Sequence, residues 1–328
     1  MSAMFRVVAT DRVSTQGLAP LRDDGRFAVV EIEDSSDPRF EAELATASGL
    51  IVRSATKVDE AMLERARELK AVGRAGVGVD NIDVEAASAR GIAVLNAPAG
   101  NTIAAAELTI TLILSVVRRV AEADRSIRAG KWERSRFQGV ELRGRTLGVI
   151  GAGRIGAAVA ERCRAFGMKI IAYDPYLAAD RLADLGVPVG QLEDLLRASD
   201  VLTLHVPLTD ETKGMIDDSA FEKMKPGAFL VNVSRGGVVD ESALATALRE
   251  GRIAGAALDV YENEPLPGDS PLLAAPNVVL TPHLGASTSE AQVQVALEVA
   301  AGLREALAHG DMSAAVNSAE IARAAGLS

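Results

Sequence analysis

One stretch constrains the fold more than any other: the glycine fingerprint Gly151-x-Gly153-x-x-Gly156. It follows a short β-favouring run, Thr146–Ile150, and leads into a helix-like segment from Ile155 to about Phe166. This strand–turn–helix context gives the fingerprint a meaning that three glycines alone lack. In a dinucleotide-binding turn, Gly151 permits the tight turn, Gly153 lets a pyrophosphate approach the main chain and Gly156 lets the helix pack on the strand. The free N–H groups at the helix N-terminus would then face the phosphates.

A second apolar run, Lys169–Tyr173, is closed by Asp174. An acid at the end of the second strand of such a unit accepts hydrogen bonds from the ribose of an adenosine. Because a carboxylate there repels a 2′-phosphate, we expect NAD rather than NADP as the cofactor. The alternative is a glycine-rich turn that binds no ligand.

Residues 1 to about 98 contain apolar runs that alternate with segments of helical spacing, such as Glu60–Glu68 and Val84–Ala89. This alternation predicts a parallel sheet with helices on both faces. The expected strands are Phe5–Ala9, Phe27–Ile32, Gly49–Val52, Ala71–Arg74 and Ala93–Asn96.

Two loops in this region are candidate binding loops, because ligands of parallel sheets bind beyond the carboxyl ends of the strands. The loop Arg53–Lys57 is basic and rich in hydroxyl groups, so it could hold an anion. The loop Arg74–Asn81 contains Gly76 and Gly78, which let a ligand approach the main chain. Either loop could instead be a solvated or strained turn.

A long apolar helix is expected from Ile103 to Val120, and Asn101 and Thr102 could cap its N-terminus. Its apolar run is too short and too interrupted to span a membrane. A helix that is apolar on nearly every face is buried on all sides, so this one should link two domains and could also contact a second subunit. The basic segment Arg128–Arg136 that follows is a solvated face, a subunit contact or a second anion clamp.

After the fingerprint, four further strands are expected, over residues 201–204, 228–233, 255–258 and 278–280. Each ends at polar or ionisable side chains, at the edge where a Rossmann sheet holds its ligand. These side chains are His205, Ser234, Arg235, Asp259 and His283. Residues 287 to about 307 should form a helix that crosses back onto the first domain.

A nicotinamide cofactor carries the hydride, so the protein must grip the substrate and move one proton. Arg235 has a planar guanidinium that suits a carboxylate. His283 can exchange a proton with the substrate hydroxyl, while Glu264 could hold its other ring nitrogen. Asp259 could orient the nicotinamide carboxamide, and His205 is expected to form a wall of the cofactor pocket. Alternatively, His283 could cap a helix and Glu264 could pair with a surface arginine.

The composition narrows the partners. A chain of 328 residues has room for two domains, and its formal net charge of -10 argues against binding to nucleic acid or to an acidic membrane. A small anionic substrate is compatible with this charge, because a local arginine cluster can outweigh it. The single cysteine, Cys163, leaves no disulfide framework and no signal peptide is evident, so we expect a cytoplasmic protein. No metal site is expected.

Several longer motifs are far more specific than the fingerprint. They are Arg74–Asn81, Asn96–Asn101, Gly130–Arg134, Gly139–Gly144, Asn232–Gly237, Asp240–Glu241, Ala257–Val260, Glu264–Pro265 and Pro282–Thr288. Through these motifs the sequence resembles the D-isomer-specific 2-hydroxyacid dehydrogenase family over essentially its whole length.

The resemblance implies that the catalytic residues are Arg235, Glu264 and His283. Together with the residues above, the cofactor candidates are Gly151, Gly153, Arg154, Ile155, Gly156, Asp174, His205, Val206, Pro207, Ser234, Asp259 and Gly285. The candidate substrate contacts are Arg53, Ser54, Val77, Gly78, Asn101 and Arg134. Many relatives have a hydroxyl residue at position 206, so Val206 removes one possible hydrogen bond to the cofactor.

The resemblance also implies an α/β fold of two doubly wound parallel-sheet domains, with a Rossmann NAD-binding domain inserted into a flavodoxin-like substrate domain. The substrate-binding domain would comprise residues 1–98 and 286–328, and the NAD-binding domain residues 99–285. A homodimer formed through the cofactor domains is expected.

Within the family, the sequence is most similar to members that act on a phosphorylated 2-hydroxy acid, where basic residues such as Arg53, Lys57, Arg134 and Arg136 help to hold the phosphate. One alternative is a reductase of unphosphorylated 2-oxo acids such as hydroxypyruvate or glyoxylate. Another is a cofactor-sensing binding protein of the corepressor kind. Many phosphate-specific members continue into a serine-binding regulatory domain; this sequence ends at Ser328, so regulation through such a domain is not expected.

Overall fold

The computed structural model describes residues 4–176 and 191–324. The chain forms two compact units: unit 1 comprises Met1–Asn101 with Ala286–Ser328, and unit 2 comprises Thr102–Gly285. The chain therefore leaves unit 1, completes unit 2 and returns. The boundaries expected from the sequence were residues 99 and 286, whereas unit 2 begins at Thr102 and unit 1 resumes at Ala286.

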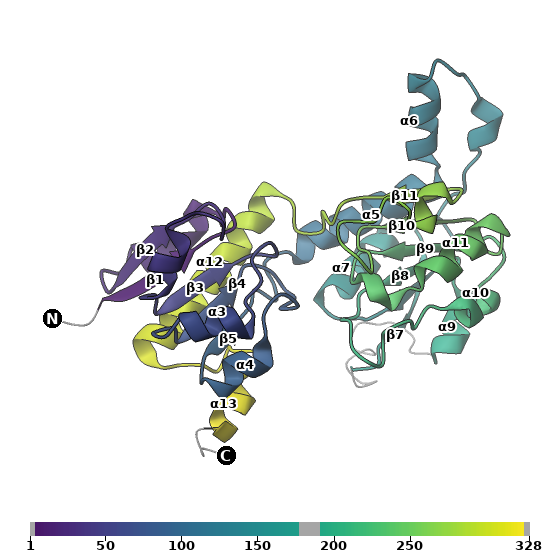
Figure 1. Ribbon diagram of the computed structural model, residues 1–328. Coiled ribbons are helices and arrows are strands. Elements are labelled where there is room, and N and C mark those ends of the chain that lie inside the picture. Colours follow the sequence, from purple (N-terminus) through teal and green to yellow (C-terminus); the bar gives the residue numbers. More distant parts are fainter. Residues whose placement is uncertain (1–3, 177–190, 325–328) are drawn as a thin grey trace. The chain divides into compact units, whose positions relative to one another are not determined.

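The described part of unit 1 contains a sheet of five parallel strands in the order β2-β1-β3-β4-β5 (Figure 1). The strands are β1 Phe5–Ala9, β2 Phe27–Glu31, β3 Gly49–Val52, β4 Ala71–Arg74 and β5 Ala93–Leu95. All five were predicted, although β2 and β5 end one residue earlier than expected. Because the strands are parallel, the loops that follow β1, β3 and β4 meet along one edge of the sheet.

A helix from the C-terminal part of the chain, α12, covers one face of this sheet (Figure 1). A β-carbon at Gly73 of β4 would lie 2.3 Å from Cγ1 of Val299 on α12, so the helix and sheet meet closely. The predicted return of this segment to the first domain is confirmed. The helices of unit 1 are η1 Thr15–Leu18, α1 Ala19–Arg22, α2 Phe40–Leu44, α3 Glu60–Arg65, α4 Val84–Ala89, α12 Ser289–His309 and α13 Ser318–Ala324.

In unit 2, the described residues form six parallel strands in the order β11-β10-β9-β8-β6-β7. The strands are β6 Thr146–Ile150, β7 Lys169–Tyr173, β8 Val201–Leu204, β9 Phe229–Asn232, β10 Gly255–Leu258 and β11 Val278–Leu280. The fingerprint strand β6 lies between β7 and β8, so the strand order reverses at β6. Ligands of doubly wound sheets bind beyond the carboxyl ends of the strands at such a reversal. The predicted α/β fold class is confirmed.

Helices cover both faces of the unit 2 sheet (Figure 1). Among the described residues, the helices of this unit are α5 Thr102–Val117, α6 Val120–Arg128, η2 Arg134–Phe137, α7 Arg154–Ala165, α9 Leu192–Ala198, α10 Asp218–Lys223, η3 Gly236–Val238, α11 Glu241–Arg249 and η4 Pro271–Ala274. Of these, α6 and η2 project away from the sheet (Figure 1). The buried residues Ile113 and Val116 place α5 in the same core as α7 and strands β6 and β9. Over the two described segments of the chain, no helix is long and apolar enough to cross a membrane.

The helix predicted over residues 103–120 corresponds to α5, which ends three residues early, at Val117. Arg119, which adopts a left-handed conformation with φ 54°, separates α5 from α6. The guanidinium of Arg119 donates to Glu122 Oε2 at 2.7 Å and to the carbonyl oxygen of Arg136 at 3.1 Å, which fixes the break. The predicted burial on all sides is also wrong, since Ile103 is 51% exposed.

Candidate active site

The three fingerprint glycines meet three different requirements. Gly151 has φ 90°, and a β-carbon there would lie 2.6 Å from the carbonyl carbon of His205. A β-carbon at Gly156 would lie 2.0 Å from the carbonyl oxygen of Gly151, so only glycine lets α7 pack at this distance. Gly153 has no atom within 4 Å of its β-carbon position and precedes the first turn of α7. Its open side is where a ligand could approach the main chain.

Asp174, directly after β7, is tied to the fingerprint loop. Its Oδ2 accepts the N–H of Ala152 at 2.7 Å, and its Oδ1 accepts the N–H of Tyr176 at 2.8 Å. An acid was predicted here, but its hydrogen bond to the fingerprint loop was not. An acid at this position is the residue type that accepts hydrogen bonds from an adenosine ribose.

His205 follows β8 and its main chain covers Gly151. The ring Nε2 lies 3.0 Å from Thr203 Oγ1, and burial lowers the pKa of the imidazole, so it is neutral at physiological pH. This agrees with a pocket wall and argues against an acid–base role. The Val206 side chain is buried in the core at 3% exposure, so only its main chain is available to a cofactor, while Pro207 is exposed.

The Ser234–Arg235 turn after β9 is shaped by Asn232, which the sequence analysis did not single out. Asn232 Oδ1 accepts from both the N–H and the hydroxyl of Ser234, at 2.9 and 2.8 Å, and its Nδ2 donates to the carbonyl oxygen of Arg235 at 2.8 Å. The next residue must be glycine, because a β-carbon at Gly236 would lie 1.9 Å from the carbonyl group of Tyr261. The turn therefore packs directly on the loop that leads to Glu264.

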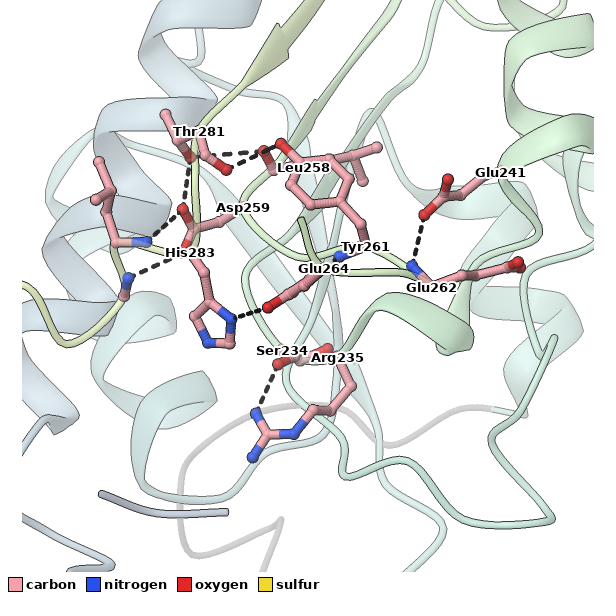
Figure 2. Close-up of polar contacts among 12 residues, drawn as sticks. Ser234, Arg235, Glu241, Leu258, Asp259, Tyr261, Glu262, Glu264, Thr281 and His283 are labelled. Atoms are coloured by element: carbon pink, nitrogen blue, oxygen red, sulfur yellow. Dashed lines mark hydrogen bonds and ion pairs between the residues drawn. The ribbon is translucent and has the colours of Figure 1, made fainter. Parts of the chain in front are cut away.

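The predicted pairing of His283 with Glu264 is confirmed. His283 Nδ1 lies 2.6 Å from Glu264 Oε2, and the side chains are 45% and 37% exposed (Figure 2). The other carboxylate oxygen, Oε1, accepts the N–H of Tyr261 at 3.1 Å. The imidazole is thus held at one nitrogen, and Nε2 is left for a reacting proton.

The charge of Glu264 is stabilised by its neighbours. Burial alone would raise the pKa of its carboxyl, but the hydrogen bond and charge of His283, the Tyr261 amide and the charge of Arg235 together lower it. Glu264 is therefore ionised at neutral pH. Figure 2 shows the third catalytic candidate, Arg235, on the same side of the loop as this pair.

Asp259, fully buried after β10, clamps the loop that carries His283. Its Oδ1 accepts the Thr281 hydroxyl at 2.6 Å and the N–H of Leu284 at 2.7 Å, and its Oδ2 accepts the N–H of Gly285 at 2.9 Å. Burial raises the pKa of this carboxyl, although these donors oppose the shift. The clamp was not foreseen from the sequence; the contact with the nicotinamide carboxamide stays a prediction.

His283 itself has a left-handed backbone with φ 55°. A non-glycine residue there costs about 1–2 kcal/mol. Its N–H donates to the Asp259 carbonyl oxygen at 2.9 Å, so Asp259 contacts the loop through its main chain as well as its carboxylate. Asp259 therefore stabilises His283 in a backbone conformation that is otherwise unfavourable for a histidine.

Two further supports escaped the sequence analysis. The Tyr261 hydroxyl donates to the carbonyl oxygens of Leu258 and Thr281, at 3.2 and 2.9 Å, and burial raises its pKa to about 12. Glu241 Oε1 accepts the N–H of Glu262 at 2.7 Å. A buried tyrosine or a glutamate at a helix start carries no sequence signal that distinguishes such a role from ordinary packing or capping.

The substrate candidates fall into separate groups. Arg53 and Ser54 follow β3, and Val77 and Gly78 follow β4, so these four share the carboxyl edge of the unit 1 sheet. Arg134 begins η2 of unit 2 and is exposed.

Asn101 is the last residue of unit 1. Its predicted capping role is wrong, because the buried oxygens Asn101 Oδ1 and Thr102 Oγ1 receive no hydrogen bond from the described residues. A buried amide oxygen without a partner requires an explanation, and a ligand contact at Asn101 would supply one.

The carboxyl edge of the unit 2 sheet fits a dinucleotide. The open main chain at Gly153 and the N-terminus of α7 suit a pyrophosphate, and Asp174 lies where an adenosine ribose would bind. Arg154 is exposed on the first turn of α7 and Ile155 is half-buried behind it. Ser234, Asp259 and Gly285 lie at the ends of β9, β10 and β11, toward which the nicotinamide end would extend.

Comparison with known proteins agrees with this geometry. Residues 110–285 match the NAD-binding domain of the D-isomer specific 2-hydroxyacid dehydrogenases, so the chain belongs to that family.

Among curated relatives, the D-3-phosphoglycerate dehydrogenase of Archaeoglobus fulgidus is 48% identical over 302 residues, which cover 90% of this chain and 56% of the relative. The chain therefore spans about half the length of the curated relatives it matches.

Two solved structures illustrate how far the fold similarity extends. A protein of Thermus thermophilus is 39% identical with a TM-score of 0.83, covering 93% of this chain and 97% of that one. An NADPH-dependent glyoxylate/hydroxypyruvate reductase from Sinorhizobium meliloti is 33% identical with a TM-score of 0.82, covering 97% and 98%. The similarity therefore covers both units.

Proposed function

We propose that the protein catalyses the NAD-dependent interconversion of 3-phosphoglycerate and 3-phosphohydroxypyruvate, the D-3-phosphoglycerate dehydrogenase reaction of L-serine biosynthesis. The observation that carries the proposal is the 2.6 Å contact between His283 and Glu264, with Arg235 beside it, in a chain of this family. The name of the 48% identical relative supports the choice of substrate.

A bound NAD would supply the hydride acceptor for the carbon that carries the hydroxyl group. The other tasks belong to residues of the chain. Arg235 would bind the substrate carboxylate through its planar guanidinium. His283, held at Nδ1 by Glu264, would take the hydroxyl proton at Nε2 and return it in the reverse reaction. The ionised Glu264 would fix the tautomer and stabilise the imidazolium that forms.

We assign the phosphate end of the substrate to Arg53. Arg53 is a half-buried residue whose guanidinium forms no ion pair with the rest of the described chain, and such a planar cation suits a phosphate. Ser54, Val77, Gly78 and Asn101 would contact the remainder of the substrate. Arg134, exposed on η2, would contribute a second positive charge, supplied to the site of a partner subunit.

The first test compares the consumption of NADH with 3-phosphohydroxypyruvate, hydroxypyruvate and glyoxylate. We expect kcat/KM to be about a hundredfold or more higher for the phosphorylated acid, since its phosphate adds charge-assisted contacts. Equal or reversed preference would overturn the substrate assignment. The variant Arg53→Ala should lose most of the preference, whereas Arg67→Ala, at an exposed arginine of the same unit, should keep it.

The second candidate is a reductase of unphosphorylated 2-oxo acids. It is favoured by the TM-score of 0.82 with the glyoxylate/hydroxypyruvate reductase, which extends over nearly the whole of both chains. Such an enzyme would use the same Arg235, Glu264 and His283. In that case Arg53→Ala would leave kcat/KM for hydroxypyruvate and for the phosphorylated acid in their wild-type ratio.

We also propose a homodimer formed through unit 2. Helix α6 and η2 project from the rest of this unit (Figure 1), and beside them lies a hollow of about 710 Å³ lined in part by Phe137, Leu273 and Val279. Trp132 is 80% exposed in the same segment, and such exposed apolar groups mark interaction surfaces. Light scattering should give twice the chain mass, and a monomer at micromolar concentration would contradict the proposal.

A cytoplasmic location is proposed from the cysteine content. The single cysteine, Cys163, is buried and unpaired, and burial raises its pKa to about 11, so it is inert. Fractionation of cells that express the protein would test the location.

A further inference from the structure

We propose that Asp11 and Asn81 are positioning residues that shape the Arg53 loop for the anionic end of the substrate. The inference rests on the proposed function, because it takes Arg53 to be the residue that binds this anion.

The strand order places these two residues on either side of the Arg53 loop. Strand β3, which the loop follows, lies between β1 and β4. Asp11 comes shortly after β1, and Asn81 lies in the segment after β4. Both side chains therefore reach the same loop from neighbouring strand ends.

Asp11 binds the donors of the loop. Its Oδ2 accepts the N–H of Arg53 at 2.8 Å and that of Thr56 at 3.0 Å, and its Oδ1 accepts the Thr56 hydroxyl at 2.6 Å. Asp11 is 7% exposed and Thr56 is 1% exposed, so these bonds are shielded from water.

Asn81 binds the acceptors of the same loop. Its Nδ2 donates to the main-chain carbonyl oxygens of Arg53 and Thr56, both at 2.7 Å. The main-chain carbonyl oxygen of Asn81 accepts the N–H of Val58 at 2.8 Å. The main-chain N–H and carbonyl groups of Arg53 and Thr56 are thus all held by two side chains. The turn is fixed without using the guanidinium of Arg53.

The backbone at Asp11 indicates that this arrangement is kept at a cost. Asp11 and Arg12 both have left-handed conformations, with φ 60° and 53°. Two consecutive non-glycine residues in this region are uncommon, and strain of this kind clusters at ligand-binding sites. The carboxylate that this backbone directs into the loop is the group that holds Arg53.

A fixed loop matters here because arginine is long and flexible. Holding its main chain limits the positions that the guanidinium can reach, which lowers the entropy lost when an anion binds. Loosening the loop should weaken the grip on a phosphorylated substrate while leaving proton transfer by His283 unchanged. Asp11 and Asn81 would then govern KM for that substrate and not kcat.

The decisive variant is Asp11→Gly. Glycine accepts the left-handed backbone, so the change removes the carboxylate without adding strain. We expect KM for 3-phosphohydroxypyruvate to rise about tenfold, while kcat stays within about twofold of the wild-type value. For hydroxypyruvate, kcat/KM should stay within about twofold of the wild-type value. Asp11→Asn, which keeps an acceptor oxygen and tolerates the same backbone, should restore most of the affinity.

A double-mutant cycle separates this inference from the proposed function. In an Arg53→Ala background, Asp11→Gly should cause no further rise in KM, because both changes remove the same grip. If Arg53→Ala alone leaves KM unchanged, the proposed phosphate site is wrong. If Arg53→Ala raises KM but Asp11→Gly does not, or if its effect persists without Arg53, the positioning role is overturned.

A matched control addresses a general loss of stability. The buried Asn317 also makes several hydrogen bonds in unit 1, to Ser88, Ile92 and Val94, at the amino end of β5. Asn317→Ala should lower the melting temperature without changing KM; a similar rise in KM would overturn the inference. Should Asp11→Gly fail to fold, Thr56→Val removes only the hydroxyl bond, and an unchanged KM in that variant would count against the proposal.

Discussion

Two buried aspartates, one in each unit, hold a loop in the same way, but the functional side chains that the two loops carry are held differently. Asp11 and Asp259 each follow a strand and each accept two main-chain N–H groups and one threonine hydroxyl from the loop of a neighbouring strand. In unit 2 the functional side chain, His283, is itself held by Glu264. In unit 1 the guanidinium of Arg53 is left without an ion pair within the described residues.

The difference follows from the two tasks. Proton transfer requires one nitrogen of one tautomer at a defined place, so both the loop and the ring must be fixed. Binding a phosphate requires a cation that adapts to a rotating tetrahedral group. For this it is sufficient that the main chain of Arg53 is fixed and that its guanidinium is free to move. The same clamp thus serves a rigid group in unit 2 and an adaptable one in unit 1.

The largest expected effect concerns the rigid group. His283→Ala should lower kcat by about a hundredfold or more with every substrate, the usual scale for an acid–base residue. His309→Ala, at an exposed histidine on α12, should retain wild-type turnover. Steady-state kinetics would decide, and intact turnover in His283→Ala would mean that unit 2 holds no proton-transfer group at this position.

A smaller effect is expected from the clamp of unit 2. Asp259→Ala leaves the N–H groups of Leu284 and Gly285 without their acceptor, so we expect a loss of about 2–4 kcal/mol in stability and a roughly tenfold lower kcat. Unlike Asp11→Gly, this change should affect phosphorylated and unphosphorylated substrates equally. If Asp259→Ala changed only KM for the phosphorylated acid, the proposed difference between the functions of Asp259 and Asp11 would be wrong.

The smallest effect concerns alkaline stability. Because the pKa of Tyr261 is raised to about 12, the folded state keeps the phenol protonated where the unfolded chain ionises, near pH 10. Its stabilising contribution is therefore complete below pH 10 and is lost as pH rises toward 12.

Tyr261→Phe removes two hydrogen bonds and should cost about 1–2 kcal/mol at pH 8. In urea titrations, the difference in the free energy of unfolding between wild type and this variant should become smaller between pH 10 and 12. A difference that stays constant over this range would contradict the prediction.

Much of this architecture could be predicted from the sequence, for physical reasons. Alternating apolar runs fixed the strands, and the fingerprint and strand-end residues placed His283, Arg235 and Asp174 at one edge of a sheet. The features that were not predicted are long-range contacts and an unusual backbone conformation. Nothing in the sequence distinguishes an aspartate that binds a loop from one that binds a ligand, so the clamps of Asp11 and Asp259 were missed. The break at Arg119 was missed because an arginine seldom takes a left-handed backbone.

The return of α12 to unit 1 has a consequence for synthesis on the ribosome. Val299 and Leu303 cover the sheet at Gly73, yet they are translated some two hundred residues after it. Unit 2 is continuous in sequence and can fold before α12 is made, whereas one apolar face of the unit 1 sheet stays uncovered until α12 emerges. During synthesis, unit 1 therefore exposes apolar surface for longer than unit 2 does.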